Sequence, residues 1–182
     1  MTDAEMLALC VFQEARGEPD DGVAAVARVV LNRTGLRYAS DGTIAGTVLR
    51  PSQFSWVNYE MVDGHYARVA TTSGEVDARV VALLAQGMGQ PQAWARCVRI
   101  AAAVQAGTYQ GSSYAKLTAD TVLYYAPAAC RAPVWATPLA FVTQIGGQRF
   151  FRDISHGSRE PVPALATQVA ASAAATERAL DA

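Results

Sequence analysis

The chain has 182 residues, of which 51% are hydrophobic and 8% aromatic, so a globular domain with a sizeable core is expected. Its formal net charge is −1, so the composition lacks the excess of positive charge that is typical of proteins that bind nucleic acid or an anionic membrane. No apolar run approaches the ~18 residues that a membrane-spanning helix needs. The acidic first residues lack the basic and apolar regions of a signal peptide, so we expect synthesis in the cytoplasm without one.

Two helices are predicted at the start of the chain. Thr2 and Glu5 have the spacing of a capping box, so the first helix should run from about residue 3 to Arg16. The second should begin near Pro19, a residue suited to a first helical position, and end near Arg33. Its apolar residues recur at helical spacing: Val23, Val26, Ala27, Val30 and Leu31.

Glu14 is the candidate catalytic residue of this junction. It continues an apolar stripe of the first helix and should therefore point inward. Burial raises a carboxyl pKa, and a Glu that is protonated near neutral pH can act as a general acid. A structural acid paired with Arg16 or Arg33 explains the position equally well. The stripe consists of Leu7, Cys10 and Val11.

Three more acids, Glu18, Asp20 and Asp21, follow at the start of the second helix. Negative side chains are favourable in a first helical turn, beside the positive end of the helix dipole. The simplest interpretation of all three is therefore structural.

The periodicity weakens over residues 34–72, where a short helix is indicated only around 43–49. Gln53, Phe54 and Trp56 follow in a segment that mixes polar and aromatic residues. Rings stack on sugar faces and amides bond hydroxyl groups, so the segment suits a sugar-contacting surface. The alternative, which the residues alone favour, is an ordinary loop whose two rings are anchored in the core.

The remaining elements predict an α+β fold. Apolar periodicity from Val76 to Leu84 marks a third long helix, and a fourth runs between Pro91 and Gly107. Strand-like runs then cover 121–125, 141–145 and 148–151, the last two flanking a Gly-Gly hairpin turn. A small antiparallel sheet should therefore lie beside a mainly helical body. Residues 155–182 are Ala-rich and lack aromatics, so they are expected to form a tail after a domain at 1–154.

No cofactor or metal site is indicated. Cys10 and Cys97 lie in apolar helical stripes and should be buried thiols, although a bridge from Cys97 to Cys130 stays open. His65 and His156 lie in polar, Gly-containing stretches and are interpreted as surface loop residues. A peptidase or amidase, which would need a Cys/His pair or a metal cluster, is therefore not supported.

Six segments, in this order, carry a family pattern. They are Glu14-Ala15-Arg16-Gly17-Glu18-Pro19, Gly22 through Arg33, Gln53-Phe54-Ser55-Trp56, Asp120-Thr121-Val122-Leu123-Tyr124-Tyr125, Pro133-Val134-Trp135-Ala136 and Ile145-Gly146-Gly147-Gln148-Arg149-Phe150-Phe151-Arg152. The segments lie between residues 14 and 152 and resemble the spore-cortex-lytic (SleB-type) cell-wall hydrolases, which also occur among bacteriophage lysis genes. The resemblance covers about residues 4–153. The chain departs from that family where Gln148 replaces a usual His and where Val122-Leu123 replaces a usual Gly-Ala.

The resemblance implies a lysozyme-like α+β fold and cleavage of the MurNAc–GlcNAc backbone of peptidoglycan. Enzymes of this family resemble lytic transglycosylases, which leave 1,6-anhydro-MurNAc ends without a metal or cofactor. The resemblance matches Glu14 to the catalytic acid. The candidate substrate-binding residues are Glu18, Gln53, Phe54, Trp56, Tyr124 and Tyr125.

Two hypotheses for the function follow. The first is a peptidoglycan-cleaving enzyme of the phage or prophage endolysin type, which reaches the cell wall at lysis or is carried there on a particle. The second is a non-catalytic glycan-binding or structural subunit of a phage-like particle, docked through residues 155–182.

Overall fold

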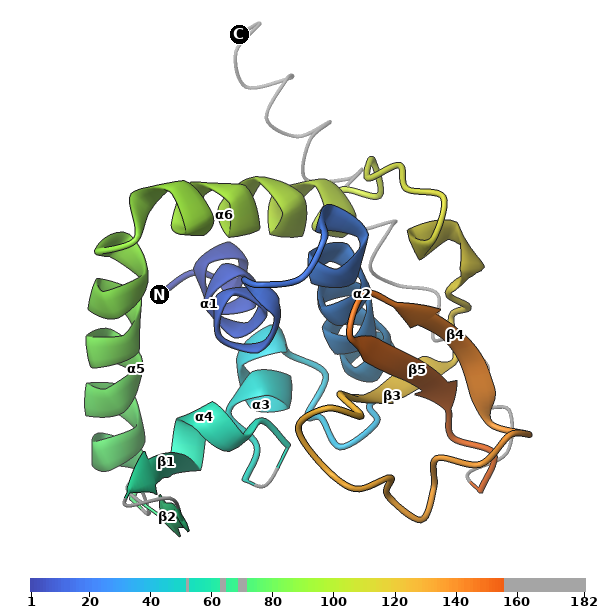
Figure 1. Cartoon of the computed structure of the whole chain (residues 1–182). Coiled ribbons are helices and arrows are strands. Elements are labelled where there is room, and N and C mark those ends of the chain that lie inside the picture. The colour runs from blue at the N-terminus through green and yellow to red at the C-terminus, as the bar shows by residue number, and fades with distance from the viewer. Residues whose placement is uncertain (52, 63–64, 69–71, 156–182) are drawn as a thin grey trace, which may run out of the picture.

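The computed structural model describes residues 1–51, 53–62, 65–68 and 72–155, and it shows a helical body flanked by a small sheet (Figure 1). The helices are α1 (Asp3–Ala15), α2 (Asp20–Leu36), α3 (Ile44–Val48), α4 (Ser55–Asn58), α5 (Ser73–Met88), α6 (Pro91–Gln105) and a 3-10 turn, η1 (Tyr114–Lys116). The strands are β1 (Tyr59–Val62), β2 (His65–Arg68), β3 (Thr121–Tyr125), β4 (Phe141–Ile145) and β5 (Gln148–Arg152). The predicted α+β class is confirmed.

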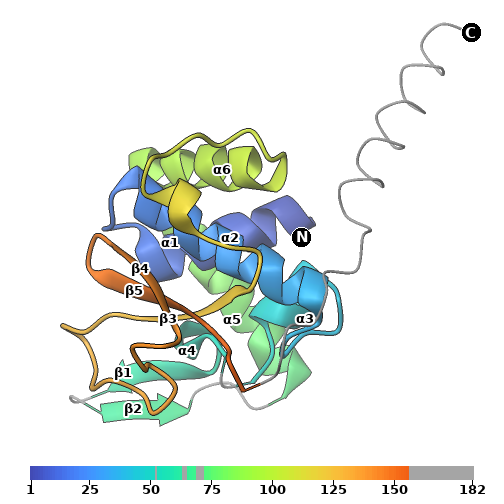
Figure 2. The same ribbon diagram turned by 90° about the vertical axis from the view of Figure 1, so that its right-hand side faces the viewer.

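Helix α1 lies inside the body, with α2 on one side and α5 and α6 on the others (Figures 1 and 2). Its start is the predicted capping box, in which Thr2 Oγ1 accepts from the Glu5 amide at 3.2 Å and Glu5 Oε2 accepts from the Thr2 amide at 2.7 Å. Every residue from Met6 to Phe12 is buried, so this helix is covered all round and not only along one stripe.

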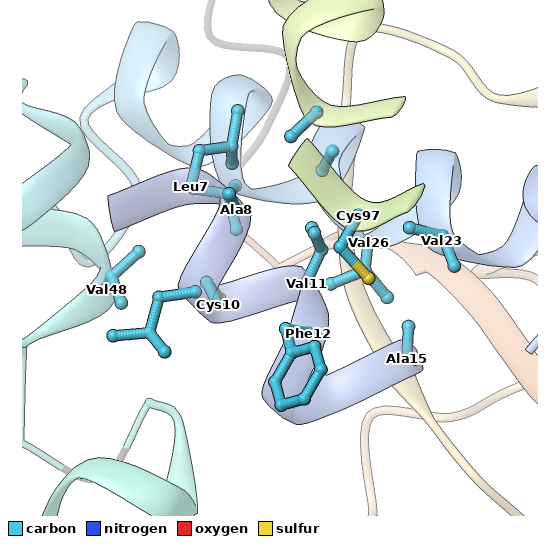
Figure 3. Packing of buried hydrophobic residues seen from close by; sticks show 14 of the residues in the cluster. Leu7, Ala8, Cys10, Val11, Phe12, Ala15, Val23, Val26, Val48 and Cys97 are labelled. Carbon is cyan, nitrogen blue, oxygen red and sulfur yellow. The ribbon is translucent and has the colours of Figure 1, made fainter. Parts of the chain in front are cut away.

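The core is formed where α1, α2 and α6 meet. One buried cluster contains Val11 and Phe12 of α1, Val23 and Val26 of α2 and Cys97 of α6, and Figure 3 shows Val11 next to Val26 and Cys97. Burying a side chain of this kind contributes about 1.5–3 kcal/mol, so this meeting point largely fixes how α1 and α2 approach each other. The Gly17 break between the two helices is held in place as a result.

The three-stranded sheet has the order β3-β5-β4, with both neighbouring pairs antiparallel. The Gly-Gly turn predicted between the last two strands is present, and Gly146 adopts a φ of 57°, which an L side chain rarely takes. Successive side chains of β5 alternate between faces: Phe150 joins the helical core, and Phe151 joins a second cluster on the outer face. Each face of the sheet therefore contributes to a hydrophobic cluster.

The region 34–72 contains more structure than the sequence predicted. Helix α4 and the hairpin β1–β2 consist of four residues per element, too few to show a helical or strand period. His65 lies in β2 and not in a loop, which corrects that prediction. His156 and the tail predicted at 155–182, apart from Ser155, lie outside the described residues.

The three cysteines are free thiols, so the bridge left open between Cys97 and Cys130 is not formed. Cys10 and Cys97 are buried, as predicted, and Cys130 is exposed. In the described part of the chain, no helix is both long and apolar enough to cross a membrane.

Candidate active site

Glu14 lies in the last turn of α1 and lines a hollow of about 360 Å³ at the junction with α2. The hollow is formed by the chain as it leaves one helix and enters the next, so the Gly17 break shapes it directly. Its lining residues are Gln13, Glu14, Ala15, Arg16, Gly17 and Glu18. The sequence prediction that Glu14 points toward the protein interior from α1 agrees with this placement.

One oxygen of the Glu14 carboxyl is held by the sheet. The Tyr124 hydroxyl donates to Glu14 Oε2 at 2.8 Å, and the Tyr124 ring stacks on Phe150 with centroids 5.8 Å apart. Tyr124 reaches Glu14 because its side chain is on the face of β3 that packs against the helices. Among the described residues, no hydrogen bond is made to Glu14 Oε1, so only one oxygen of this carboxyl has a partner.

Burial raises the pKa of the Glu14 carboxyl above its ordinary value. The hydrogen bond from Tyr124 and the positive charge of Arg33 act in the opposite direction, but burial outweighs them. This is the environment that keeps a carboxyl protonated closer to neutral pH, as a general acid requires.

Neither arginine considered as a structural partner forms an ion pair with Glu14 in the described part of the chain. Arg16 Nη1 donates to the Phe12 carbonyl at 3.2 Å, and its guanidinium lies over the Phe12 ring. Arg33 Nε donates to the Val122 carbonyl at 2.6 Å and so ties α2 to β3. The described site therefore contains no ion pair between Glu14 and Arg16 or Arg33, and the structural alternative is not supported.

Arg33, considered from the sequence only as a possible ion-pair partner, acts on Glu14 through its charge. Its side chain is only 6% exposed, and its guanidinium lies 5.4 Å from the centroid of the Phe54 ring. Arg33 Nη1 also donates to Gln53 Oε1 at 3.4 Å. The buried positive charge of Arg33 lowers the pKa of Glu14, although Arg33 and Glu14 form no ion pair among the described residues.

Glu18 lines the same hollow, but its carboxylate is engaged. Glu18 Oε2 accepts a hydrogen bond from the Gly147 amide at 2.8 Å, which fixes the tip of the β4–β5 hairpin to the helix junction. Arg96 Nη2 donates to the Glu18 carbonyl at 2.6 Å from the other side. The structural interpretation of Glu18 is supported, with a partner that lies far away in the sequence.

Asp20 and Asp21 lie in the first turn of α2, as predicted, and each also holds another segment. Asp20 pairs with Arg96 at 2.6 Å. Asp21 accepts from the Tyr109 hydroxyl at 2.9 Å and from the Ser113 amide at 2.8 Å, which anchors the loop after α6. Neither acid lines the hollow.

Gln148 is a site residue that the sequence reasoning noted only as a departure from the family pattern. It is 4% exposed, and its Nε2 donates to the Glu14 carbonyl at 3.2 Å. Gln148 Oε1 and Gln13 Nε2 are both buried without a hydrogen-bond partner. The backbone of Glu14 is therefore supported by β5 as its side chain is supported by β3.

Three of the candidate substrate-binding rings are not at the hollow. Phe54 and Trp56 are 2% and 9% exposed and belong to the helical core, which corrects the sugar-contacting interpretation in favour of the core anchor. Their ring faces are covered because large apolar area gains more from burial than from partial exposure. Tyr125 points to the outer face of the sheet, and Gln53 is half-buried beside Arg33. Glu14, Glu18 and Tyr124 are the candidates that the fold brings together.

No three His, Cys, Asp or Glu side chains gather in a way that could hold a metal ion, within the residues that the structure describes.

Comparison with known proteins decides the family. A family model described as Cell Wall Hydrolase matches residues 17–151, about three quarters of the chain. The chain belongs to this cell wall hydrolase family. The match begins just after Glu14, and it includes Tyr124 and the Gly-Gly hairpin. The resemblance to SleB-type hydrolases is thereby confirmed.

Two relatives of the cell wall hydrolase chain add detail. The spore cortex-lytic enzyme of Oceanobacillus iheyensis is 42% identical over 55 residues, which are 30% of this chain. The chain thus matches only 20% of that enzyme's length. The crystal structure of the catalytic domain of the Bacillus cereus SleB protein aligns with a TM-score of 0.45 and 21% identity, covering 82% of this chain and 89% of that one.

Proposed function

We propose that this cell wall hydrolase cleaves the MurNAc–GlcNAc backbone of peptidoglycan as a lytic transglycosylase, with Glu14 as its general acid and base. The observation that carries the proposal is one carboxyl with a raised pKa, held by Tyr124 at the edge of an open hollow. Membership of the cell wall hydrolase family supports the choice of substrate.

The chemistry needs a single carboxyl used twice. Protonated Glu14 gives its proton to the glycosidic oxygen as the bond from that oxygen to the muramyl C1 breaks, and the GlcNAc end leaves as an alcohol. The Glu14 carboxylate then takes the proton of the muramyl 6-hydroxyl as its oxygen attacks C1. The products are a 1,6-anhydro-MurNAc end and a protonated Glu14, so the enzyme is restored without consuming water.

The other acids of the junction support this intramolecular route. Ordinary retaining and inverting glycosidases need a second carboxylate to attack or to activate water. Here the carboxylate of Glu18 is engaged by the Gly147 amide, that of Asp20 by Arg96, and that of Asp21 by Tyr109 and Ser113. Each has a structural partner that a catalytic role would have to displace.

Digestion of purified sacculi followed by mass spectrometry tests the proposal. We expect glycan fragments that end in 1,6-anhydro-MurNAc. Fragments with only reducing MurNAc ends would mean that water attacks and that a second carboxylate is used. Cut stem peptides would contradict a glycosidase altogether.

The same digestion identifies the acid. Glu14→Gln should lower turnover by roughly 10²–10⁴-fold, the usual scale for a general acid, while Glu18→Gln should have a modest effect. The reverse ranking would show that Glu18 is the acid. If the wild type binds glycan but neither cleaves it nor responds to Glu14→Gln, the glycan-binding hypothesis replaces this one.

A further inference from the structure

A second hollow, also of about 360 Å³, lies on the outer face of the sheet. It is bounded by the ends of strands β3, β4 and β5 and by the loop that joins β3 to β4. Tyr125, Thr137, Phe141, Gln144, Arg149 and Phe151 are among its lining residues. Nothing in the proposed reaction uses these side chains.

This hollow and Glu14 lie on opposite faces of one sheet. Neighbouring residues of a strand point to opposite sides, and Tyr124 reaches Glu14 whereas its neighbour Tyr125 lines the outer hollow. In β5 the same division separates Gln148, which supports Glu14, from Arg149. The outer hollow is therefore a separate site and not an extension of the one at Glu14.

Arg149 is the charged group of the hollow. It is exposed, and the strand register places it between Tyr125 of β3 and Gln144 of β4. Its Nε donates to Gln144 Oε1 at 3.2 Å, which orients the guanidinium and leaves the remaining N–H donors of its planar fork. None of the described lining residues is acidic, and no described carboxylate pairs with Arg149.

The wall beside Arg149 is aromatic. Phe151 forms its centre, stacked on Tyr125 at 5.7 Å and in edge contact with Phe141 at 5.6 Å and with Trp135 at 5.5 Å. Phe141 is 41% exposed although its ring is large and apolar. An apolar wall next to an unpaired cation complements a ligand that has both an apolar part and an anion.

We propose that this outer hollow binds a carboxylate-bearing peptide. Resting on the proposed function, we identify that peptide as the stem peptide of peptidoglycan, whose short alanine side chains suit the aromatic wall and whose carboxylates suit Arg149. A guanidinium binds a carboxylate through two parallel hydrogen bonds, which gives orientation as well as affinity. A neutral glycan strand would leave Arg149 without an anion.

Titration of the full wild-type chain with a synthetic, sugar-free stem tetrapeptide tests the inference, because such a peptide has no glycosidic bond to cut. We expect binding by calorimetry, with amide NMR shifts concentrated at 141–144 and 149–151. Arg149→Gln should weaken binding by about tenfold or more, the scale of a hydrogen bond to a charged group. Arg152→Gln is the matched control, since it removes an exposed arginine of the same strand that does not line the hollow.

Two further ligands define the result. A tetrapeptide with amidated carboxyl groups should bind at least tenfold more weakly than the free acid. Equal binding by wild type and Arg149→Gln, equal loss with Arg152→Gln, or shifts only around Glu14 would overturn the proposal. Tighter binding of a polyol phosphate polymer than of the peptide would assign the hollow to that anion instead.

The outcome is independent of the proposed reaction. If sacculi remain uncut while the peptide binds through Arg149, the proposed glycosidase reaction is contradicted and the proposed peptide site is supported. If normal 1,6-anhydro products form but the peptide does not bind, the reaction is supported and the peptide site is contradicted.

Discussion

Glu14 obtains its chemistry from its surroundings. Glu5 caps a helix, and Glu18 holds the Gly147 amide of a turn. Of these three described glutamates, only Glu14 combines burial with a hydroxyl donor and a nearby buried arginine. Burial is the larger of these effects, and it disfavours the charged form. The consequence can be measured as a dependence of stability on pH.

Glu14→Gln should raise the free energy of unfolding at neutral pH and leave it nearly unchanged at acidic pH. The folded chain raises the Glu14 pKa above its ordinary 4.5. Between these two pKa values the folded state binds more protons than the unfolded state, so wild-type stability falls as pH rises through that window. Glutamine does not titrate, and it keeps an oxygen for Tyr124. Urea unfolding of both proteins at several pH values measures the difference.

A difference between wild type and Glu14→Gln that is the same at every pH would contradict this prediction, since it would arise from packing and not from titration. A wild type that becomes more stable as pH rises through the window would show that Glu14 is ionised on folding.

The inward placement of the Glu14 side chain could be predicted from the sequence because its signal is local. An acid that continues an apolar helical stripe points inward whatever the rest of the chain does. Its hydrogen-bond partner Tyr124 is 110 residues away, and no periodicity encodes that contact. For Phe54 and Trp56, the sequence could not decide whether the rings are buried. Aromatic rings among polar residues are compatible with a binding surface or with a core, and tertiary packing determines which one forms.

At the scale of elements, the hairpin β4–β5 is fixed to the α1–α2 junction by one contact. Gly146 has a positive φ, and a Cβ placed on it would collide with the Glu18 carboxylate that accepts from Gly147. The contact positions β5, which carries Gln148 under the backbone of Glu14. The turn is therefore part of the support of the candidate active site.

Gly146→Ala should destabilise the fold more than Gly107→Ala. Both glycines have positive φ, which costs an L side chain about 1–2 kcal/mol. A Cβ at Gly146 would also collide with the Glu18 carboxylate, whereas a Cβ at Gly107 would meet no atom within 4 Å. Thermal unfolding of the two variants therefore separates the clash from the backbone strain. Adding Glu18→Ala to Gly146→Ala should close much of the gap. Equal losses at the two glycines would mean that the Glu18 contact is absent in solution.

The elements that the sequence predicted are those with a strong local signature. The long helices carry several turns of apolar periodicity and recognisable caps, and the Gly-Gly turn between two β-type runs specifies a hairpin. Helix α4 and the pair β1–β2 were missed because four residues do not complete a measurable period. Where α2 ends was also missed: it continues past Arg33 to Leu36 and stops at Arg37 in a left-handed conformation.

For the whole molecule, the sheet connects two sites. Its inner face supports Glu14 through Tyr124 and Gln148, and its outer face carries the hollow around Arg149. Peptidoglycan is a branched polymer whose glycan strands and stem peptides run in different directions. One such polymer would therefore supply a glycan to the inner site and a peptide to the outer site. Both proposed sites lie within residues 13–151, which has a consequence for truncation.

Removing residues 156–182 should leave folding and turnover on soluble glycan nearly intact. The described elements from Asp3 to Arg152 already contain both core clusters, and Asp153 anchors the chain after β5 by accepting from the Tyr38 hydroxyl at 2.8 Å. Burial, with help from Asp153, raises the pKa of Tyr38 from its ordinary 10 to about 12, so this hydroxyl stays a donor even at alkaline pH. A chain that ends at Ser155 should melt within about 4 °C of the full chain, a shift worth ~1 kcal/mol at this size.

A chain that ends at Arg152 is the control and should melt lower, because it loses the Asp153 anchor. If the two truncations melt alike and both far below the full chain, residues 156–182 pack on the domain and the predicted boundary is wrong.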